Sequence, residues 1–477
     1  MNLHTRRILY SFFIALFLIA APPLVLYTAG FRYDFKYKRI IETGSMVVKS
    51  NPEGALIFIN GEQYKDQTPT IINTIPPGKI NLLVQKQGYH DWEKEVEIYE
   101  RVTAFEDSIK LYPTANPEPI LSKLIIDYWW NNKYDKIAYA TKDGELRMFN
   151  TLNKKDLLIA NVKDKKLKEF KWSYFDDQFL FSRISGKDEE YFIVDADFFE
   201  KMIRIDSIIN IPIKSAQWDQ SAPNTLYAIS GGSLYRIPYL LQTARLVYKG
   251  PVESYLAEKS RIIFIEKDKS GENFVSWISK SNTTTIHIIP SFSPSSSDKL
   301  VRTNSHRIAL YREKTKDMAI IDPSIQITES GSNKGESVVV IPSVIGWLWS
   351  NDGKTLLYTD EYGVYKREFT TPISVIPSKN LSQLVVKYSK PINEIAWSES
   401  ESRILYSMDN SLRVARVNSS SEPRSIVLSD VSASKIQTIQ KQDIITFISK
   451  DEFLMAIPLS IENSGPGLLR GKDIGGE

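Results

Sequence analysis

A phrase built on tryptophan recurs along most of this chain. It consists of an apolar residue, any residue and a tryptophan, followed by polar turn residues and an apolar strand ending in an aromatic residue. The clearest copy is Trp349–Tyr358, and other copies begin at Trp130, Trp172, Trp218 and Trp397. Neighbouring tryptophans lie roughly 42 to 48 residues apart, the period expected of four-stranded propeller blades. One blade cannot bury its own faces, so the repeat predicts a ring of stacked sheets.

The number of copies sets the expected number of blades. Less regular copies lie at 255–264, 303–310 and 439–447. Eight phrases favour eight blades, or seven if the last copy completes the first blade. We assign residues 119–461 to this β-propeller and expect its repeated tryptophan to pack between blades.

The clearest copy also resembles a known repeat. Residues 349–358 (WSNDGKTLLY) are similar to the repeat of TolB-like and WD40-like propellers, and the other copies match it in outline. The resemblance implies a fold, and that fold hosts binding proteins and enzymes alike.

The N-terminus carries an uncharged apolar run, Ile8–Ala29. As a helix it spans roughly 33 Å, enough for a hydrocarbon core of about 30 Å. A signal peptide also begins with basic residues, but this run is long for one, and Pro22 disfavours cleavage after Ala20-Ala21. We therefore expect a single-pass, uncleaved transmembrane helix at 8–29, kinked by its prolines, and a cytoplasmic tail at 1–7. The body is expected outside, because long C-terminal domains translocate largely regardless of flanking charge.

Residues 30–43 are assigned to a juxtamembrane linker. From Phe31 to Lys38 aromatic residues alternate with charged ones. This alternation predicts a strand with one aromatic face. It also suits a stretch that places aromatic rings among lipid headgroups.

Residues 51–113 are dense in hairpin signals. The apolar segment 55–59 leads directly into Asn60-Gly61, a pair that supplies the positive φ angles of a tight primed turn. A Pro-Pro-Gly turn at 76–78 separates predicted strands at 70–75 and 80–85. Several short strands with regular turns predict a small β-sandwich.

Five short motifs in this region resemble the PEGA domain family, which is named for a Pro-Glu-Gly-Ala signature. That signature stands at Pro52–Ala55, and the others are Asn60-Gly61, Thr68-Pro69, Pro77-Gly78 and Gly88-Tyr89. The resemblance covers 44–113 and departs from the family pattern at Asp66, where glycine is usual. It implies a small β module of bacterial or archaeal envelope proteins, without catalytic residues, and it supports an external body.

Composition excludes several kinds of chemistry. The 477 residues include no cysteine, which rules out disulfides, thiolate nucleophiles, cysteine zinc sites and iron–sulfur clusters. With 60 basic and 57 acidic residues, the net charge of +3 argues against a nucleic-acid partner. Metalloprotease, nucleophile-elbow, phosphate-loop, dinucleotide and calcium-loop motifs do not occur. We therefore predict no catalytic, cofactor-binding or metal-binding residues and no cofactor.

Four sets of polar residues are candidate sites, and we expect each of them to have a structural role instead. Clustered carboxylates can perform acid–base or sugar chemistry, but a solvated hairpin end explains them as well. A serine–aspartate–lysine spacing resembles the Asp-box turn of some glycosidase propellers, but it occurs only once. A lysine run suits a solvated loop better than a site for an anionic polymer, and lone histidines suit surface or packing positions. The residues are Glu189, Glu190, Asp195 and Asp197; Ser350, Asp352 and Lys354; Lys163, Lys165, Lys166, Lys168 and Lys171; and His4, His90, His287 and His306.

The expected function is display rather than catalysis. An anchor, a β spacer and a propeller suggest a protein of the prokaryotic cell envelope that binds another envelope protein or a surface polysaccharide. The alternative is a hydrolase of glycans or peptides with carboxylates converging in the propeller channel. A sensor is a third possibility, although a tail of about seven residues is too short to fold as an output domain. Residues 291–297 are expected to form a flexible loop, and 462–477 a disordered tail.

Overall fold

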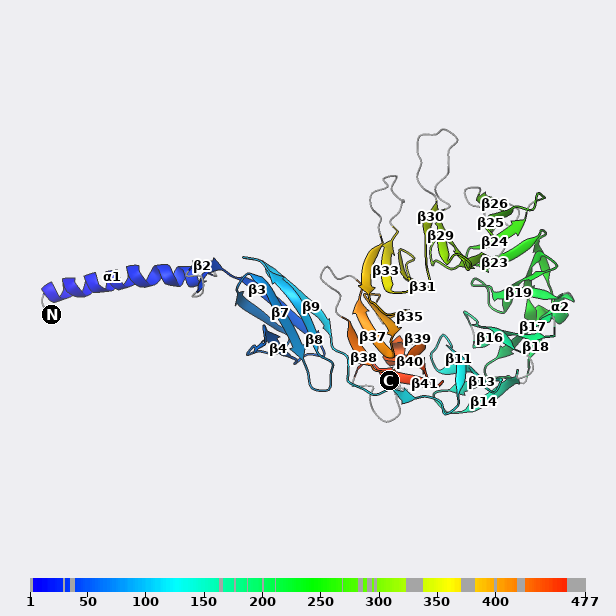
Figure 1. Ribbon diagram of the computed structural model, residues 1–477, viewed down its shortest axis with the longest axis horizontal. Coiled ribbons are helices and arrows are strands. Elements are labelled where there is room, and N and C mark those ends of the chain that lie inside the picture. The colour runs from blue at the N-terminus through cyan, green and yellow to red at the C-terminus, as the bar shows by residue number, and fades with distance from the viewer. Residues whose placement is uncertain are drawn as a thin grey trace, which may run out of the picture. The chain divides into compact units, whose positions relative to one another are not determined.

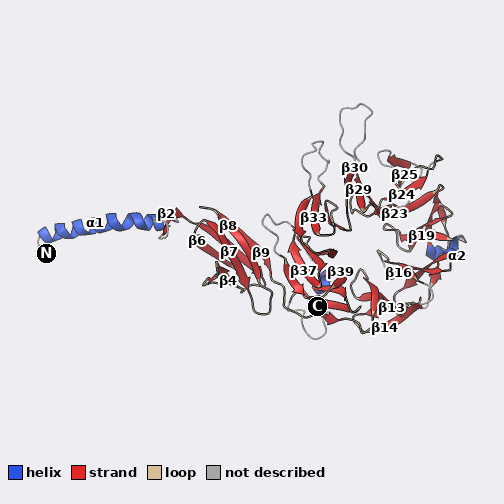
Figure 2. Cartoon of the chain, viewed as in Figure 1, coloured by secondary structure: helices blue, strands red, loops and turns tan. Residues whose placement is uncertain are grey.

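A computed structural model gives the fold of the chain. Met1–Thr114 and Ala115–Ser419 belong to two different compact units, which are treated separately below. The structure describes residues 3–28, 31–34, 39–162, 166–175, 177–186, 188–199, 201–210, 212–267, 269–281, 286–289, 294–295, 298–322, 338–369, 382–398, 401–417 and 425–460. The tail at 462–477 and most of the loop expected at 291–297 lie outside these residues. Strands dominate the described chain (Figure 2).

Helix α1 (Leu3–Thr28) is the long helix of the chain (Figure 1). It begins before the predicted start at Ile8, so part of the expected tail is helical, and it continues through Pro22 and Pro23. Within it Leu9–Thr28 has a mean hydropathy of 2.3 and is long and apolar enough to cross a membrane. None of this span is buried against the protein. The helix can therefore serve as a membrane span or as a signal sequence.

The expected linker at 30–43 contains a β-hairpin. Strands β1 (Phe31–Asp34) and β2 (Arg39–Glu42) pair antiparallel, with Phe31 opposite Glu42 and Asp34 opposite Arg39. The prediction of one strand running from Phe31 to Lys38 was therefore wrong. Alternation alone does not reveal where a strand reverses direction.

Residues 44–110 form two facing sheets. One sheet has the order β6-β3-β9 and the other β5-β4-β7-β8. The strands are β3 (Gly44–Asn51), β4 (Leu56–Ile59), β5 (Glu62–Gln63), β6 (Thr70–Ile75), β7 (Gly78–Gln85), β8 (Trp92–Ile98) and β9 (Thr103–Lys110). Met46 and Ile72 from the first sheet share one buried cluster with Leu82 and Val96 from the second. This shared core makes the module a small β-sandwich.

The second unit is a β-propeller of four-stranded antiparallel sheets. The described residues between Glu118 and Pro458 contain eight such sheets, here called blades 1 to 8, and each follows chain order from its first to its fourth strand, except blade 8. Blades 1 to 4 comprise β11 (Ile125–Trp130), β12 (Lys136–Thr141), β13 (Glu145–Asn150) and β14 (Asp156–Asn161); β15 (Leu167–Trp172), β16 (Gln178–Ser185), β17 (Asp188–Asp195) and β18 (Ile203–Arg204); β19 (Ile213–Trp218), β20 (Thr225–Ser230), β21 (Ser233–Pro238) and β22 (Arg245–Tyr248); and β23 (Val252–Ala257), β24 (Arg261–Lys267), β25 (Asn273–Ser279) and β26 (Ile286–Ile289).

The remaining blades continue around the ring. They comprise β27 (Lys299–Val301), β28 (Ile308–Arg312), β29 (Asp317–Ile321) and β30 (Val338–Ile341); β31 (Gly346–Trp349), β32 (Thr355–Thr359), β33 (Gly363–Glu368) and β34 (Gln383–Lys387); β35 (Ile392–Trp397), β36 (Arg403–Met408), β37 (Ser411–Arg416) and β38 (Ile426–Ser429); and β39 (Ala433–Ile439), β40 (Ile444–Ser449) and β41 (Leu454–Pro458) with β10 (Glu118–Pro119). Short helical segments are α2 (Asp206–Ile209), η1 (Tyr239–Leu241) and η2 (Gln440–Gln442).

Blade 8 joins the two ends of the propeller sequence. Its order is β10-β41-β40-β39, so the strand that precedes blade 1 supplies the fourth strand of blade 8. Glu118 lies opposite Ala456 and Pro119 opposite Met455. This pairing, rather than a last copy completing blade 1, closes the ring visible in Figure 1.

The Asn60-Gly61 turn between β4 and β5 is a two-residue hairpin loop. Ile59 pairs with Glu62, and both turn residues have positive φ, 51° and 87°. The primed turn predicted from the sequence is therefore confirmed. A Cβ at Gly61 would meet no atom within 4 Å, so only its backbone conformation restricts the residue.

We predict that Gly61→Val destabilises the isolated 43–114 module by about 1 kcal/mol or more, because a β-branched residue is strained at positive φ. Thermal or denaturant unfolding of the module measures this. Glu62→Val, in the adjacent exposed strand, is the control and is expected to leave stability nearly unchanged. Equal melting of wild type and Gly61→Val would contradict the assigned turn.

Candidate functional site

The tryptophan of each clear copy occupies the same place in its blade. Trp130, Trp172, Trp218, Trp349 and Trp397 are each the last residue of a first strand. Trp130, Trp218 and Trp349 are buried, whereas Trp172 and Trp397 are half-buried. The predicted structural equivalence is confirmed, with burial that varies from blade to blade.

These tryptophans also link neighbouring blades. The Nε1 of Trp172 donates to the carbonyl oxygen of Trp129 at 3.1 Å, and that of Trp218 to Lys171 at 3.0 Å. Trp397 donates to the Trp349 carbonyl at 3.0 Å. Each of these bonds joins the C-terminal ends of the first strands of two neighbouring blades. These first strands therefore end on the same side of the propeller.

We call the end of the propeller where the first strands finish the turn face. In an antiparallel sheet that follows chain order, it carries the turn from first to second strand and the connection from third to fourth. In four blades the turn from the first to the second strand is closed by the same backbone hydrogen bond. The N–H of the residue after the tryptophan donates to the carbonyl of the residue five positions later. The N–H groups of Asn131, Ser173, Ser350 and Ser398 bond the carbonyls of Lys136, Gln178, Thr355 and Arg403.

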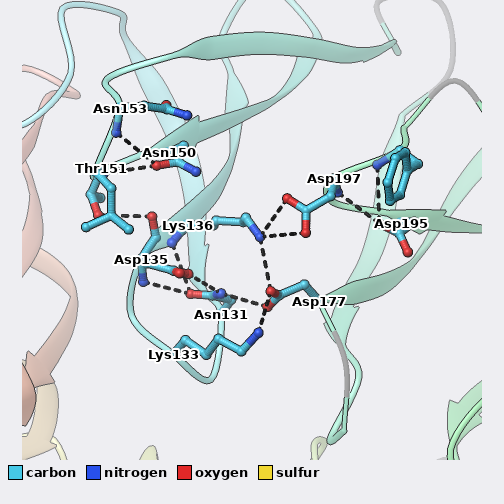
Figure 3. Close-up of polar contacts among 12 residues, drawn as sticks. Asn131, Lys133, Asp135, Lys136, Asn150, Thr151, Asn153, Asp177, Asp195 and Asp197 are labelled. Atoms are coloured by element: carbon cyan, nitrogen blue, oxygen red, sulfur yellow. Dashed lines mark hydrogen bonds and ion pairs between the residues drawn. The ribbon is translucent and has the colours of Figure 1, made fainter. Parts of the chain in front are cut away.

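A polar cluster joins the turn face of blade 1 to that of blade 2 (Figure 3). The Nζ of Lys136, on β12, lies 3.0 Å from Asp177 and 2.9 Å from Asp197, two carboxylates of blade 2. Lys133 contacts Asp177 at 2.8 Å, and the Asn131 amide donates to it at 2.9 Å. The Lys136 side chain is only 8% exposed, so this link is largely shielded from solvent.

The cluster sets the charge states of its members. Burial alone would raise the pKa of Asp177, but hydrogen bonds from Lys133, Asn131 and Lys136 outweigh it and lower the pKa to about 2. Burial disfavours the Lys136 ammonium, yet its bonds to Asp197 and Asp177 leave its pKa raised. Both groups are therefore ionised at neutral pH, and they remain paired with each other.

Comparable polar contacts join blade 2 to blade 3 and blade 3 to blade 4. Tyr239 of blade 3 donates to the Gln178 side chain of blade 2 at 2.6 Å. Lys280 of blade 4 contacts Asp219 of blade 3 at 2.5 Å. In each case a residue of the connection between the third and fourth strands contacts the turn between the first and second strands of the preceding blade. These contacts hold neighbouring turns of the turn face together.

Exposed apolar side chains lie on turn-face connections of blades 1, 2 and 3. Their exposed fractions run from 46% to 72%, and they include all the large exposed apolar residues of the turn-face connections among the described residues. They are Leu152, Tyr174, Phe175, Phe198, Leu240 and Leu241, here called the apolar patch.

Local hydrogen bonds hold the patch residues in place. The Asn150 side chain accepts from the N–H groups of Leu152 and Asn153, and Asp195 accepts from those of Asp197 and Phe198 (Figure 3). Leu240 and Leu241 lie in η1, which Tyr239 anchors to blade 2. The apolar side chains are thus presented on fixed turns.

One contact spans the centre of the ring at this end. Arg302 of blade 5 donates to the Tyr174 hydroxyl of blade 2 at 2.5 Å, and its guanidinium lies 5.5 Å from the ring centroid. Blades 3 and 4 separate these two blades in chain order. The contact therefore joins two blades that are not neighbours in chain order.

In the structure, the polar residues that the sequence offers as candidate sites form ion pairs or close turns. Glu189 and Glu190 lie at one end of β17 and pair with Lys168 and Arg183, whereas Asp195 lies at the other end. Sequence proximity does not bring these carboxylates together. Lys168 and Lys171 lie in β15 rather than in a loop, and Lys163 and Lys165 lie outside the described residues.

The other weighed residues also have structural surroundings. Asp352 accepts from the Ser350 hydroxyl at 2.6 Å and the Lys354 N–H at 2.9 Å, which closes a turn. The Nε2 of His306 lies 3.1 Å from buried Asp322. His287 lies on β26, in the neighbouring blade, and His90 belongs to the other unit. Among the described residues, no group of three or more histidine and acidic side chains could hold a metal ion.

Sequence reasoning missed one acidic position that recurs on the innermost strands. Asp127, Glu169 and Glu394 each directly follow a register shift in the first strand of blades 1, 2 and 7. Asp127 pairs with Lys435 at 3.2 Å, Glu169 with Lys171 at 2.7 Å, and Glu394 accepts from the Lys435 N–H. Aligning the phrases backwards from each tryptophan would have placed these carboxylates three residues before it.

Residues 43–113 match the PEGA domain family. No curated protein sequence matches the chain.

Among solved structures, the chain is similar to the Dos1 propeller, with 10% identity, 72% of this chain and 93% of that chain covered, and a TM-score of 0.47. It is similar to the β-propeller domain of Cps50 (Swd1) from Myceliophteria thermophila, with 12% identity, 72% and 99% coverage, and a TM-score of 0.42. It is also similar to Hsv2 from Kluyveromyces lactis, with 13% identity, 64% of this chain and 98% of that chain covered, and a TM-score of 0.41.

The fold and the family match together define the class of protein. It contains a PEGA domain and a β-propeller, preceded by an apolar helix that is long enough to cross a membrane.

We predict that Asp177→Asn lowers the free energy of unfolding at neutral pH by about 1–2 kcal/mol, because the amide loses its charge-assisted bonds to Lys133 and Lys136. The pKa of Asp177 in the folded protein, about 2, lies below its ordinary value of 3.8. The stabilisation is therefore complete above 3.8 and is lost as the pH falls towards 2.

Denaturant unfolding at neutral pH and at about pH 3 tests this pH dependence. The difference between wild type and variant is expected to shrink at the lower pH. Asp143→Asn is the matched control, since Asp143 is exposed in the opposite turn of blade 1. A pH-independent loss, or an equal loss in the control, would contradict the charge-based account.

Proposed function

We propose that this protein is anchored in a prokaryotic cell membrane by α1, with its N-terminus in the cytoplasm, and displays its propeller outside the membrane to bind another envelope protein. The 20 residues Leu9–Thr28 span about 30 Å as a helix, which matches a hydrocarbon core. The PEGA domain supports an envelope location, because that family is typical of bacterial and archaeal envelope proteins. Binding, rather than catalysis, is the proposed role.

The apolar patch is the observation that carries the proposed partner. Scattered exposed apolar residues are normal, but a group on neighbouring turns of one face is typical of an interaction site. Phenylalanine and leucine suit the desolvated core of a protein interface better than the polar surface of a glycan. Their fixed turns also reduce the entropy lost when a partner docks. A protein partner is therefore favoured over a surface polysaccharide.

The second candidate is a hydrolase of glycans or peptides. The carboxylates of Asp127, Glu169 and Glu394 on the innermost strands favour it, since such chemistry needs acidic groups from several blades. Their pairing with Lys435 and Lys171 argues for structural roles. Burial raises the pKa of Glu394, and the bond from the Lys435 N–H opposes that rise. We rank this candidate below binding.

We predict that a cysteine in the patch captures a protein partner. The chain has no cysteine, so Leu241→Cys creates a unique reactive site for a membrane-impermeant photo-cross-linker applied to intact cells. A discrete cross-linked species is expected from Leu241→Cys, because that side chain is exposed within the patch. Leu158→Cys is the control, since Leu158 is exposed on β14 outside the patch.

Each result bears on a separate part of the proposal. Cross-linking at Leu241→Cys that is absent at Leu158→Cys supports a partner at the patch. Equal labelling without a distinct species at either site contradicts the partner surface. Labelling of both variants only after cell lysis contradicts the external location of the body.

A further inference from the structure

Two arginines face each other across neighbouring strands of blade 3. Arg236 on β21 lies directly opposite Arg245 on β22, and Tyr227 on β20 lies opposite Arg236. Directly opposite residues of an antiparallel pair project from the same face of the sheet. Tyr227 and the two arginines therefore form one row across blade 3.

This row faces blade 4. Gln217, opposite Tyr227 on β19, bridges to blade 4 by donating to the Tyr255 carbonyl at 2.8 Å and accepting from the Ala257 N–H at 3.1 Å. The Nζ of Lys280, in blade 4, lies 5.1 Å from the centroid of the Tyr227 ring. The inner end of the row is thus closed by the two blades, while Arg245 at its outer end is exposed.

A cavity of about 450 Å³ lies along the outer part of this row. This volume is within the usual range for small-molecule sites. The cavity lining includes the charged side chains of Asp219, Arg236, Arg245 and Lys280, together with Tyr227 and Val247.

The described lining has an excess of positive charge. Lys280, Arg236 and Arg245 carry three cations, and Asp219 is the only carboxylate among the lining residues. Asp219 is 1% exposed and already accepts from Lys280 at 2.5 Å and from the Ser221 N–H and hydroxyl at 2.9 and 2.6 Å. Its contact with Arg236 is long, 3.4 Å to Nε, and Arg245 forms no ion pair with a described residue.

Like charges placed directly opposite on paired strands repel each other. Burial lowers the pKa of Lys280, and nearby Arg236 lowers it further, although Asp219 opposes both effects. The positive charge of this cavity is therefore only partly compensated by the protein. A bound anion would supply the missing negative charge.

We propose that this cavity between blades 3 and 4 binds a small organic molecule through a carboxylate or phosphate group. Guanidinium groups form paired, charge-assisted hydrogen bonds with both kinds of oxyanion. Arg236 and Arg245 hold the anionic group, and Val247, which packs on the same side of the sheet as Tyr227, contacts the remainder of the ligand. Asp219 disfavours a second anionic group next to Lys280. The site does not require a partner at the apolar patch.

Isothermal titration calorimetry on the full-length protein in detergent micelles tests this site. The probes are inorganic phosphate, glucuronate and uncharged glucose, each at up to about 10 mM in low-salt buffer, because screening weakens such contacts. Phosphate or glucuronate is expected to bind and glucose is not. The stronger of the two anions identifies which oxyanion the cavity prefers.

Arg245→Gln is expected to weaken anion binding about tenfold or more, since it removes an exposed cation without disturbing the buried Asp219–Lys280 pair. Arg245→Lys is expected to retain part of the affinity. Lys249→Gln, which removes an equal charge just beyond the other end of β22, is the matched control.

Three results would overturn the proposal: binding of neither anion, equal binding of glucose, or the same loss of affinity in Lys249→Gln as in Arg245→Gln. Unchanged thermal melting of each variant without ligand shows that any loss arises at the site.

Discussion

Each propeller sheet must bury both of its faces against neighbouring sheets, because both faces carry apolar side chains. Successive residues of one strand serve opposite neighbours. Phe179 and Phe181 of β16 join the cluster shared with blade 1, whereas Leu180 between them joins the cluster shared with blade 3. Burial on both faces leaves a blade stable only within a closed ring. Pairing of β10 with β41 supplies that closure, and Tyr128 of blade 1 extends it by donating to the Lys435 carbonyl of blade 8 at 2.6 Å.

Because the sheet faces are buried, the ends of the strands and the seams between blades are left for recognition. Turns of the turn face are joined between blades, by Lys136 between blades 1 and 2 and by Tyr239 between blades 2 and 3. The apolar patch projects from these fixed turns. Gln217 joins blade 3 to blade 4. Further from the inner strands, a charged cavity between these blades is lined by the opposed Arg236 and Arg245. One construction principle thus produces both proposed binding features.

Local signals in the sequence were sufficient to predict much of the fold. The phrase 349–358 and its copies placed the tryptophans at equivalent strand ends, and Asn60-Gly61 specified its turn through backbone sterics. Features set by long-range pairing were not visible. The two-residue strand Glu118–Pro119 has no pattern of its own and exists only because β41 lies beside it. The opposition of Arg236 and Arg245 likewise depends on the register between two strands.

An engineered disulfide can show whether β10 closes the ring by pairing with β41. Glu118 and Ala456 are opposite each other, at a separation typical of paired strands and suitable for a disulfide. In this cysteine-free chain, the double variant Glu118→Cys, Ala456→Cys is expected to form an intramolecular bond under mild oxidation. The bond is expected to raise the melting temperature and to increase mobility on a non-reducing gel, and neither single variant should do so. Failure of the double variant to cross-link while it remains folded, with both thiols reactive towards maleimide, would contradict closure by this strand.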